Sequence, residues 1–140
     1  MEIIVGVSAC LVGKNTKYDG TNNKNERILE YLKDKQVVLF CPEVAGGLPT
    51  PRTPSENIKN KVFNKNGKDV TENFINGAKK ELEKLKKAQV TTIIVKERSP
   101  SCGYRKIYDG TFTSNTIDGS GVFTKLAIEN GFKILTEEDF

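Results

Sequence analysis

The chain has 140 residues and a formal net charge of +4, and a chain of this length is typical of one ordinary domain. Its hydrophobic (36%) and charged (29%) residues exclude a disordered composition. The chain contains no histidine, which excludes Ser-His-Asp and Cys-His nucleophiles, histidine general bases and histidine-containing zinc sites. We expect residues 1–140 to form a single domain.

Four continuous apolar runs rich in β-branched residues are typical of parallel strands that are buried on both faces. They are Ile3–Val7, Val37–Phe40, Thr92–Val95 and Phe132–Leu135. No basic segment followed by a long apolar stretch precedes the first run. The sequence therefore predicts neither a signal peptide nor a membrane span, and it predicts a cytoplasmic protein.

Three segments between these runs have apolar residues at helical spacing. They are Asn25–Lys33, Thr71–Ala88 and Val122–Glu129, and Asn130-Gly131 is a helix stop signal. The lysines of the second segment alternate with glutamates, which is typical of a solvated helix face. Alternating strands and helices predict an α/β fold: a three-layer Rossmann-like domain with a mainly parallel sheet flanked by helices.

The stretch from Pro42 to Gly67 interrupts this alternation with four prolines and a Gly-Gly pair. Its composition predicts an ordered loop with a restricted backbone, of the kind that often forms a lid or a binding loop. A short pattern also occurs twice, as KYDG at Lys17–Gly20 and as IYDG at Ile107–Gly110. Two Asp-Gly turns are the favoured interpretation, and a functional pair is the alternative.

Each of the three cysteines follows the end of a different predicted strand. Cys10, Cys41 and Cys102 come after the first, second and third apolar runs. Because ligands of open α/β sheets bind at the carboxyl ends of the strands, the three thiols meet at one place if these strands are neighbours. Cysteines that merely fill the core are the alternative, and an odd number excludes complete disulfide pairing within one chain.

Three thiolates without histidine suit a metal group that keeps one coordination position open. Zinc with three cysteines and a water or carboxylate is one possibility, and a [4Fe–4S] cluster with one open iron is another. The spacing of the cysteines does not distinguish them. The segment Ser8–Asn15 lacks the first glycine and the final Ser/Thr of a phosphate-binding P-loop, so we discount that motif.

The sequence around these cysteines resembles the DUF523 family, which includes thiouracil desulfidases and the catalytic domain of enzymes that remove sulfur from 4-thiouridine in tRNA. The resemblance extends over essentially the whole chain. It rests on VSACLVG at Val7–Gly13, CPEVAGGLPTPR at Cys41–Arg52, KERSPSCG at Lys96–Gly103 and IYDGTF at Ile107–Phe112.

This resemblance implies that Cys10, Cys41 and Cys102 hold a [4Fe–4S] cluster whose fourth iron is open to the sulfur of a thiolated base. It also implies that Glu43 and Ser101 are the catalytic residues. Glu43 would serve as the base that activates water, and Ser101 would relay a proton or hold the tetrahedral intermediate. Such a cluster is oxygen-labile, so we expect an aerobic preparation to lose it.

The predicted activity is a non-redox conversion of a thiolated pyrimidine to its oxo form with release of sulfide. We expect the substrate to be a free base or nucleoside, with tRNA less favoured. Two alternatives stay open: a zinc- or cluster-containing nucleic-acid-binding module, and a thiol-based sulfur carrier. Six further residues are expected to surround the substrate: Ser8, Tyr18, Arg52, Lys96, Glu97 and Arg98.

Overall fold

The computed structural model describes residues 3–140 and has a four-stranded sheet at its centre. Its strands β1 (Ile4–Ser8), β2 (Gln36–Phe40), β5 (Thr92–Val95) and β8 (Lys133–Thr136) lie in the order β2-β1-β5-β8. All neighbouring pairs are parallel. The four predicted strands are therefore confirmed, and their ends differ from the apolar runs by at most one residue.

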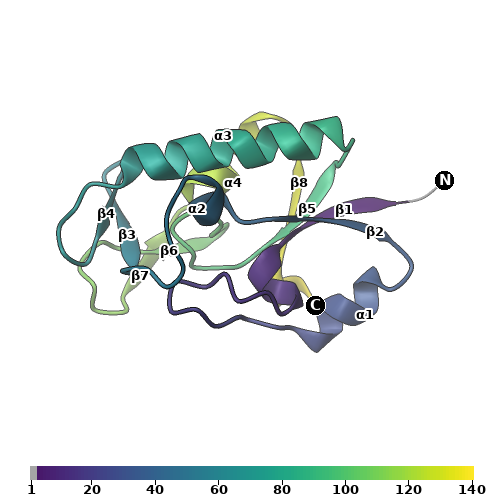
Figure 1. Ribbon diagram of the computed structural model, residues 1–140, viewed down its shortest axis with the longest axis horizontal. Coiled ribbons are helices and arrows are strands. Elements are labelled where there is room, and N and C mark those ends of the chain that lie inside the picture. Colours follow the sequence, from purple (N-terminus) through teal and green to yellow (C-terminus); the bar gives the residue numbers. More distant parts are fainter. Residues whose placement is uncertain (1–2) are drawn as a thin grey trace.

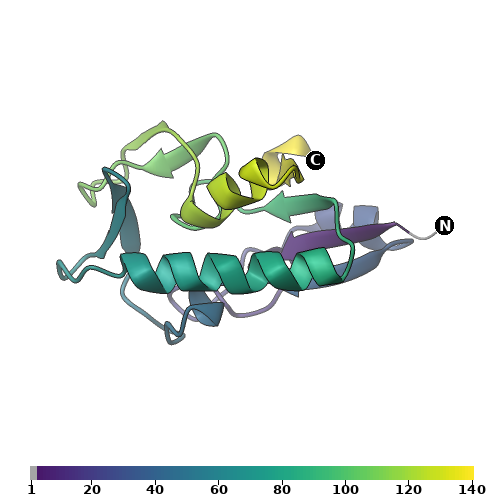
Figure 2. The same cartoon turned by 90° about the horizontal axis from the view of Figure 1, so that it is seen from above.

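Helices cover both faces of this sheet. The long helix α3 (Thr71–Lys87) and α4 (Val122–Glu129) lie on one face, and α1 (Glu26–Leu32) and the 3₁₀ helix η1 (Ala9–Val12) lie on the other. Figure 1 shows α3 above the sheet and α1 below it, and Figure 2 shows α3 and α4 side by side. The α/β fold with three layers is confirmed.

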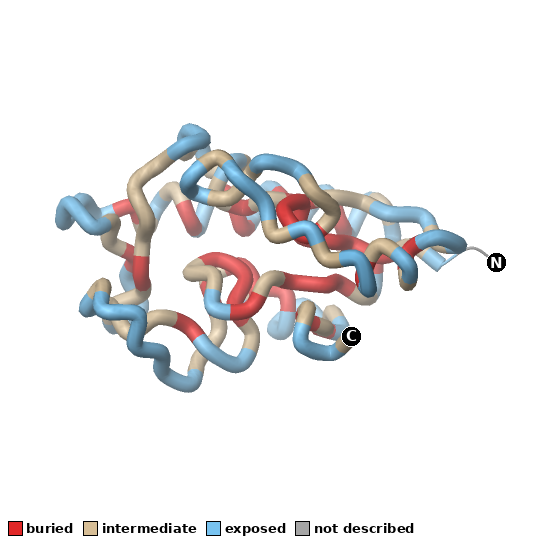
Figure 3. The backbone as a smooth tube through the Cα atoms, turned by 90° about the horizontal axis from the view of Figure 1, so that it is seen from below, coloured by how far each residue is buried: buried red, intermediate tan, exposed pale blue. Residues whose placement is uncertain are grey.

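The core has two main parts, one on each face of the sheet. Phe40 and Phe123, with ring centroids 4.8 Å apart, belong to the part beneath α3 and α4. Val7 and Ile28 belong to the part beneath α1. Figure 3 shows that the buried stretches run along the central strands. The helix α1 is capped at its amino end by Asn25, whose side chain accepts a hydrogen bond from the backbone N–H of Ile28.

The segment 42–67, predicted as an ordered loop with a restricted backbone, contains three short regular elements. It contains the short helix α2 (Pro42–Ala45) and an antiparallel hairpin of β3 (Ser55–Ile58) and β4 (Lys61–Asn64). Proline fits the first turn of a helix, because the missing N–H has no partner there. The hairpin turn consists of Lys59 and Asn60, both with positive φ, as a two-residue turn of this type requires.

A second hairpin, β6 (Lys106–Tyr108) and β7 (Thr116–Asp118), was not expected from the sequence. It lies beside β3 and β4 at the end of the molecule away from the amino terminus (Figure 1). The last element is a 3₁₀ helix, η2 (Glu137–Asp139). Within residues 3–140, no helix has the length and apolar character needed to cross a lipid bilayer.

Candidate active site

The sheet topology brings the three cysteine-bearing strand ends together. Cys41 directly follows β2, Cys10 lies in η1 directly after β1, and Cys102 lies in the loop after β5. Strands β2, β1 and β5 are neighbours in that order. All three cysteines are unpaired and line one cavity of about 410 Å³, a volume in the range of small-molecule sites.

Every site residue predicted from the sequence lines this cavity. They are Ser8, Cys10, Tyr18, Cys41, Glu43, Arg52, Lys96, Glu97, Arg98, Ser101 and Cys102.

Polar hydrogens surround the thiols at the inner end of the cavity. The side-chain amide of Asn23 donates to Cys10 Sγ at 3.4 Å, and the hydroxyl oxygen of Ser101 lies 3.5 Å from Cys102 Sγ. The Ser8 hydroxyl lies 3.7 Å from Cys10 Sγ. Polar groups thus lie beside the sulfurs of Cys10 and Cys102.

Burial raises the pKa of the Cys102 thiol well above its usual value, and it also raises the pKa of Cys41. The carboxylate of Glu43 adds to the rise at both thiols. A reactive cysteine needs a lowered pKa, because the thiolate is the nucleophile. These two thiols therefore lack the lowered pKa that activates a cysteine nucleophile.

A single zinc ion does not suit this arrangement. In the part of the chain that the structure describes, no three cysteine, histidine, aspartate or glutamate residues are grouped so that they could hold one metal ion. A cluster of four irons attaches each thiolate to a different iron, so its ligands lie further apart than those of one ion. Three separate thiols around one cavity thus fit a cluster better than zinc.

Glu43 is held between two partners at the cavity wall. It lies in the first turn of α2, and its Oε2 accepts a 2.9 Å hydrogen bond from the Ser101 hydroxyl. Its Oε1 accepts a 3.1 Å hydrogen bond from Nε of Arg52. Only 13% of the Glu43 side chain and 6% of the Arg52 side chain are exposed. The carboxylate is therefore fixed in place next to the Cys102 loop.

Arg52 connects three parts of the chain to this carboxylate. Besides Glu43, its guanidinium donates to the carbonyl oxygens of Thr16 and Pro49 and to the Thr50 hydroxyl. These contacts leave the guanidinium bound to protein groups. Arg52 also lines the cavity, and its contact with substrate stays a prediction.

The charges of Lys96, Glu97 and Arg98 are also engaged with protein groups. Lys96 and Arg98 pair with Glu137 and Glu138 of η2. The fully buried Glu97 side chain accepts, at one oxygen, the backbone N–H groups of residues 104, 105 and 106. These interactions organise the loop that carries Ser101 and Cys102. Contact of the three residues with substrate stays a prediction.

Sequence reasoning left out several residues of the cavity wall, among them Asn23, Lys65, Tyr108 and Phe112. The repeated YDG pattern was the signal that could have indicated part of this set. Both aspartates accept the N–H of the threonine two residues later, so both copies are turns, as the favoured interpretation predicted. Tyr18 and Tyr108, one from each copy, line the same cavity, which the functional alternative required.

Comparison with known proteins gives consistent results. The model of the 2-thiouracil desulfurase family matches residues 5–139. The protein YbbK of Bacillus subtilis (strain 168), described as uncharacterised, is 38% identical over 143 residues, covering 95% of each chain. A solved structure of the [4Fe-4S]-dependent thiouracil desulfidase TudS has a TM-score of 0.92 and 38% identity, and the match covers 100% of this chain and 93% of that one. The cysteine-lined cavity at the sheet edge thus occurs in a chain that belongs to the 2-thiouracil desulfurase family.

Proposed function

We propose that this protein is a [4Fe–4S]-dependent desulfidase that converts a thiolated pyrimidine and water to the oxo pyrimidine and hydrogen sulfide. The observation that carries the proposal is the hydrogen-bonded pair of Glu43 and Ser101 on the wall of a cavity that three unpaired cysteines line. The reaction exchanges sulfur for oxygen without a change of oxidation state, so it needs no electron donor.

Cys10, Cys41 and Cys102 would hold the cluster. When bound, it supplies a Lewis-acidic iron for the thiocarbonyl sulfur, which makes the attached carbon more electrophilic. The donor set supports this assignment, because soft thiolates favour iron–sulfur groups and the chain has no histidine to compete. The amide of Asn23 and the hydroxyl of Ser101 lie beside the sulfurs of Cys10 and Cys102, where they would contact the two cluster ligands.

The chain itself would supply the acid–base chemistry. Glu43 accepts one hydrogen bond at each of its two oxygens, from Arg52 and from Ser101. Its carboxylate would take a proton from the attacking water. The Ser101 hydroxyl, which contacts both Glu43 and the Cys102 sulfur, would pass a proton between the carboxylate and the substrate. Arg52 would keep the carboxylate oriented.

The substrate would be a thiolated base or nucleoside rather than tRNA, because a cavity of about 410 Å³ is in the range of small-molecule sites. We further propose that residues 1–140 act as one domain in the cytoplasm. The three unpaired thiols support this location, since thiols stay reduced there.

The test is an anaerobic sulfide-release assay after reconstitution with iron and sulfide, using 2-thiouracil, 4-thiouracil and 4-thiouridine. We expect about four irons per chain and one sulfide released per oxo product formed. Replacing Cys10, Cys41 or Cys102 by serine should remove both iron and turnover. Retention of the cluster and turnover after any one replacement would contradict the proposed ligand set.

A further inference from the structure

The loop between β6 and β7 brings Phe112 to the cavity wall in an unusual backbone conformation. Phe112 has φ of 57° and Ser114 has φ of 66°. A bulky residue rarely adopts positive φ, since this conformation costs on the order of 1–3 kcal/mol and persists only where the surroundings impose it. The contacts of the loop therefore hold Phe112 in this conformation at the cavity wall.

Glu56 of β3 provides the contacts that impose this conformation. Its Oε1 accepts the backbone N–H of Gly110 at 2.9 Å and that of Phe112 at 3.1 Å. Glu56 is buried, with 8% of its surface exposed, and hydrogen bonds to a carboxylate are about twice as strong as neutral ones. One side chain in the first hairpin thus holds two points of the loop in the second.

The loop also lies directly against β3. Gly110 has φ of 93°, and a Cβ atom there would overlap Ile58. Asp109 tightens the turn by accepting the N–H of Thr111 at 3.0 Å. The loop thus packs against β3 and is held by hydrogen bonds at Gly110 and Phe112. These contacts restrict movement of its side chains away from the cavity.

Aromatic side chains at the cavity come from the two YDG segments and from the loop that follows the second one. Tyr18, Tyr108 and Phe112 are the aromatic residues among those that line it. Phe112 is half-buried although it lies on a surface loop. A planar heterocycle stacks favourably on an aromatic ring, which contributes about 1–3 kcal/mol per base in single-stranded nucleic-acid complexes. A thiopyrimidine offers the same flat surface.

We propose that Phe112 contacts the pyrimidine ring of the substrate and determines specificity for planar thiocarbonyl heterocycles, and that Glu56 is the positioning residue that holds Phe112 in place. This inference rests on the proposed desulfidase function and adds to it. Stacking acts on substrate and transition state alike, so removing it raises KM and leaves kcat unchanged.

The kinetic test uses anaerobic sulfide release from 2-thiouracil by the reconstituted enzyme and four variants. Phe112→Leu should raise KM by about 10- to 100-fold without changing kcat, and Phe112→Tyr should restore a KM near that of the unmodified enzyme. Glu56→Gln, which weakens the two hydrogen bonds, should raise KM in the same direction. The matched control is Phe63→Leu, because Phe63 lies opposite Glu56 in the β3–β4 hairpin and does not line the cavity.

A double variant separates positioning from simple loss of stability. If Glu56 acts through Phe112, the combination of Glu56→Gln and Phe112→Leu should have the KM of Phe112→Leu alone. Additive effects would contradict the positioning role. An unchanged KM in Phe112→Leu, or the same rise in Phe63→Leu, would overturn the contact with substrate.

A binding test makes the inference independent of turnover. The chain has no tryptophan, so Phe112→Trp introduces a single fluorescent indole, and a base that stacks on it should quench its emission. Uracil should quench Phe112→Trp in a saturable manner and should leave Phe63→Trp unchanged. If the unmodified enzyme releases no sulfide, the proposed desulfidase function is contradicted. The quenching experiment still tests the contact of Phe112 with the base in that case. Absence of quenching overturns that role even if sulfide is released.

Discussion

At the scale of single residues, the site depends on one carboxylate with a fixed orientation. Glu43 lies two residues beyond Cys41, so the same short helix would supply a cluster ligand and a base. Its two oxygens are occupied by different partners, Arg52 and Ser101. In a chain without histidine, a carboxylate is the natural group for proton transfer near neutral pH.

Replacing Glu43 by glutamine tests this role directly. The amide has nearly the same shape but does not accept a proton, so we expect kcat for sulfide release to fall by about 10²- to 10⁴-fold. The visible absorbance of the reconstituted cluster should persist. Glu83→Gln on the exposed side of α3 is the control and should leave kcat unchanged. A Glu43→Gln enzyme with full turnover would exclude Glu43 as the base.

Replacing Arg52 by lysine tests orientation separately from proton transfer. Lysine keeps the positive charge, but one ammonium does not reproduce a planar guanidinium that contacts Glu43, Thr16 and Pro49 together. We expect kcat to decrease by about 10- to 100-fold, a change that a shift of the carboxylate by an ångström would cause. The KM for 2-thiouracil should change little. A rise in KM with unchanged kcat would instead support the direct substrate contact predicted from the sequence.

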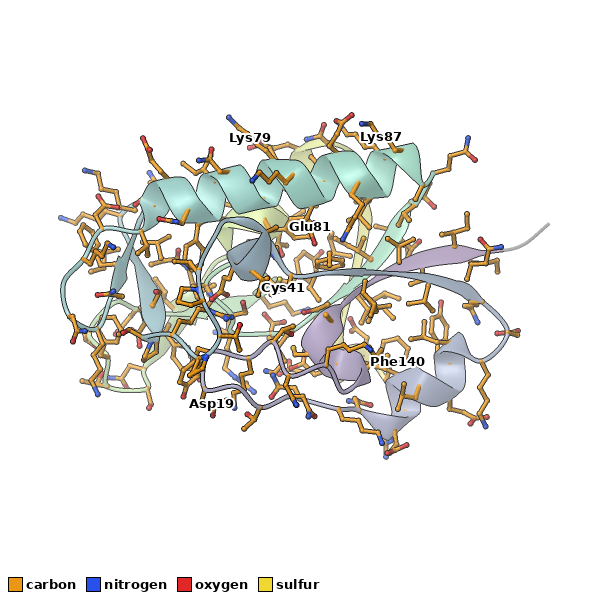
Figure 4. All side chains as sticks on the ribbon, in the orientation of Figure 1. Asp19, Cys41, Lys79, Glu81, Lys87 and Phe140 are labelled. Atoms are coloured by element: carbon orange, nitrogen blue, oxygen red, sulfur yellow. The ribbon has the colours of Figure 1, made fainter. Side chains whose placement is uncertain are left out.

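At the scale of elements, the packing of α2 on α3 determines where Cys41 and Glu43 lie. A Cβ atom at Gly77 of α3 would overlap the carbonyl oxygen of Pro42, so the two helices touch through their backbones. Glu81, one turn further along α3, accepts the backbone N–H of Cys41 at 2.8 Å, and Figure 4 shows these two residues close together. The helix α3 is thus the support for this side of the site.

Gly77→Ala should therefore damage the site. The added methyl group pushes α2 outward and shifts Cys41 and Glu43, and overpacking of this kind costs about 1–3 kcal/mol in the free energy of unfolding. We expect reduced iron content after reconstitution, together with a lower midpoint of thermal unfolding. Asn76→Ala, next to it on the exposed side of α3, is the matched control. Equal iron content in both variants would show that α2 tolerates the displacement.

The loop after β5 has a corresponding support in Glu97. Its Oε1 accepts three consecutive backbone N–H groups at 2.7, 2.8 and 3.1 Å. Its Oε2 has no hydrogen-bond partner among the described residues and lies 3.8 Å from the Arg105 guanidinium. The carboxylate thus serves the backbone of the loop that carries Cys102.

Glu97→Ala should leave those N–H groups without a buried acceptor, and a single such loss costs about 1–3 kcal/mol. We expect a clear fall in the unfolding midpoint in urea and loss of the cluster. Glu138→Ala, which removes an exposed partner of Arg98, should change the midpoint little. A Glu97→Ala protein as stable as this control would contradict the structural role of Glu97.

At the scale of the whole molecule, the cavity forms where separate parts of the chain meet. The parallel sheet supplies the strand ends that carry the cysteines, and the two hairpins supply Glu56, Tyr108 and Phe112. A group that binds all three cysteines would connect β2, β1 and the loop after β5. Cluster binding should therefore stabilise the fold as a whole, since any ligand of the folded state does so.

Differential scanning calorimetry under anaerobic conditions tests this coupling. The reconstituted protein should unfold about 5–10 °C above the cluster-free form, from a binding free energy of a few kcal/mol at this chain length. Cys102→Ser should abolish the difference, because its buried thiol is lost as a ligand. The two forms of that variant serve as the internal control. An equal midpoint for loaded and cluster-free unmodified protein would contradict coupling between the cysteines and the fold.

The sequence alone determined the strands, the main helices and the strand that each cysteine follows, whereas the order that makes these strands neighbours comes from the tertiary structure. These features depend on local patterns: continuous β-branched runs predict buried parallel strands. Apolar residues at helical spacing predict helices at Thr71–Ala88 and Val122–Glu129, and the structure has them at Thr71–Lys87 and Val122–Glu129. The position of each cysteine after a predicted strand can likewise be read directly from the sequence. The resemblance to a known family added the roles of Glu43 and Ser101, which spacing does not reveal.

Only the tertiary structure decided how the remaining wall is built. The strands of the two hairpins have three or four residues each, which is too few for a periodic pattern. The prolines of the segment 42–67 predict a loop, although α2 and β3 lie within it. The protein partners of Arg52 and Glu97 also come from the tertiary structure: Arg52 donates to the carbonyl oxygen of Thr16, and Glu97 accepts the backbone N–H of Tyr104. Glu56 and Phe112 are separated by dozens of residues and meet only in the folded chain. Such contacts depend on tertiary packing, which local sequence patterns do not reveal.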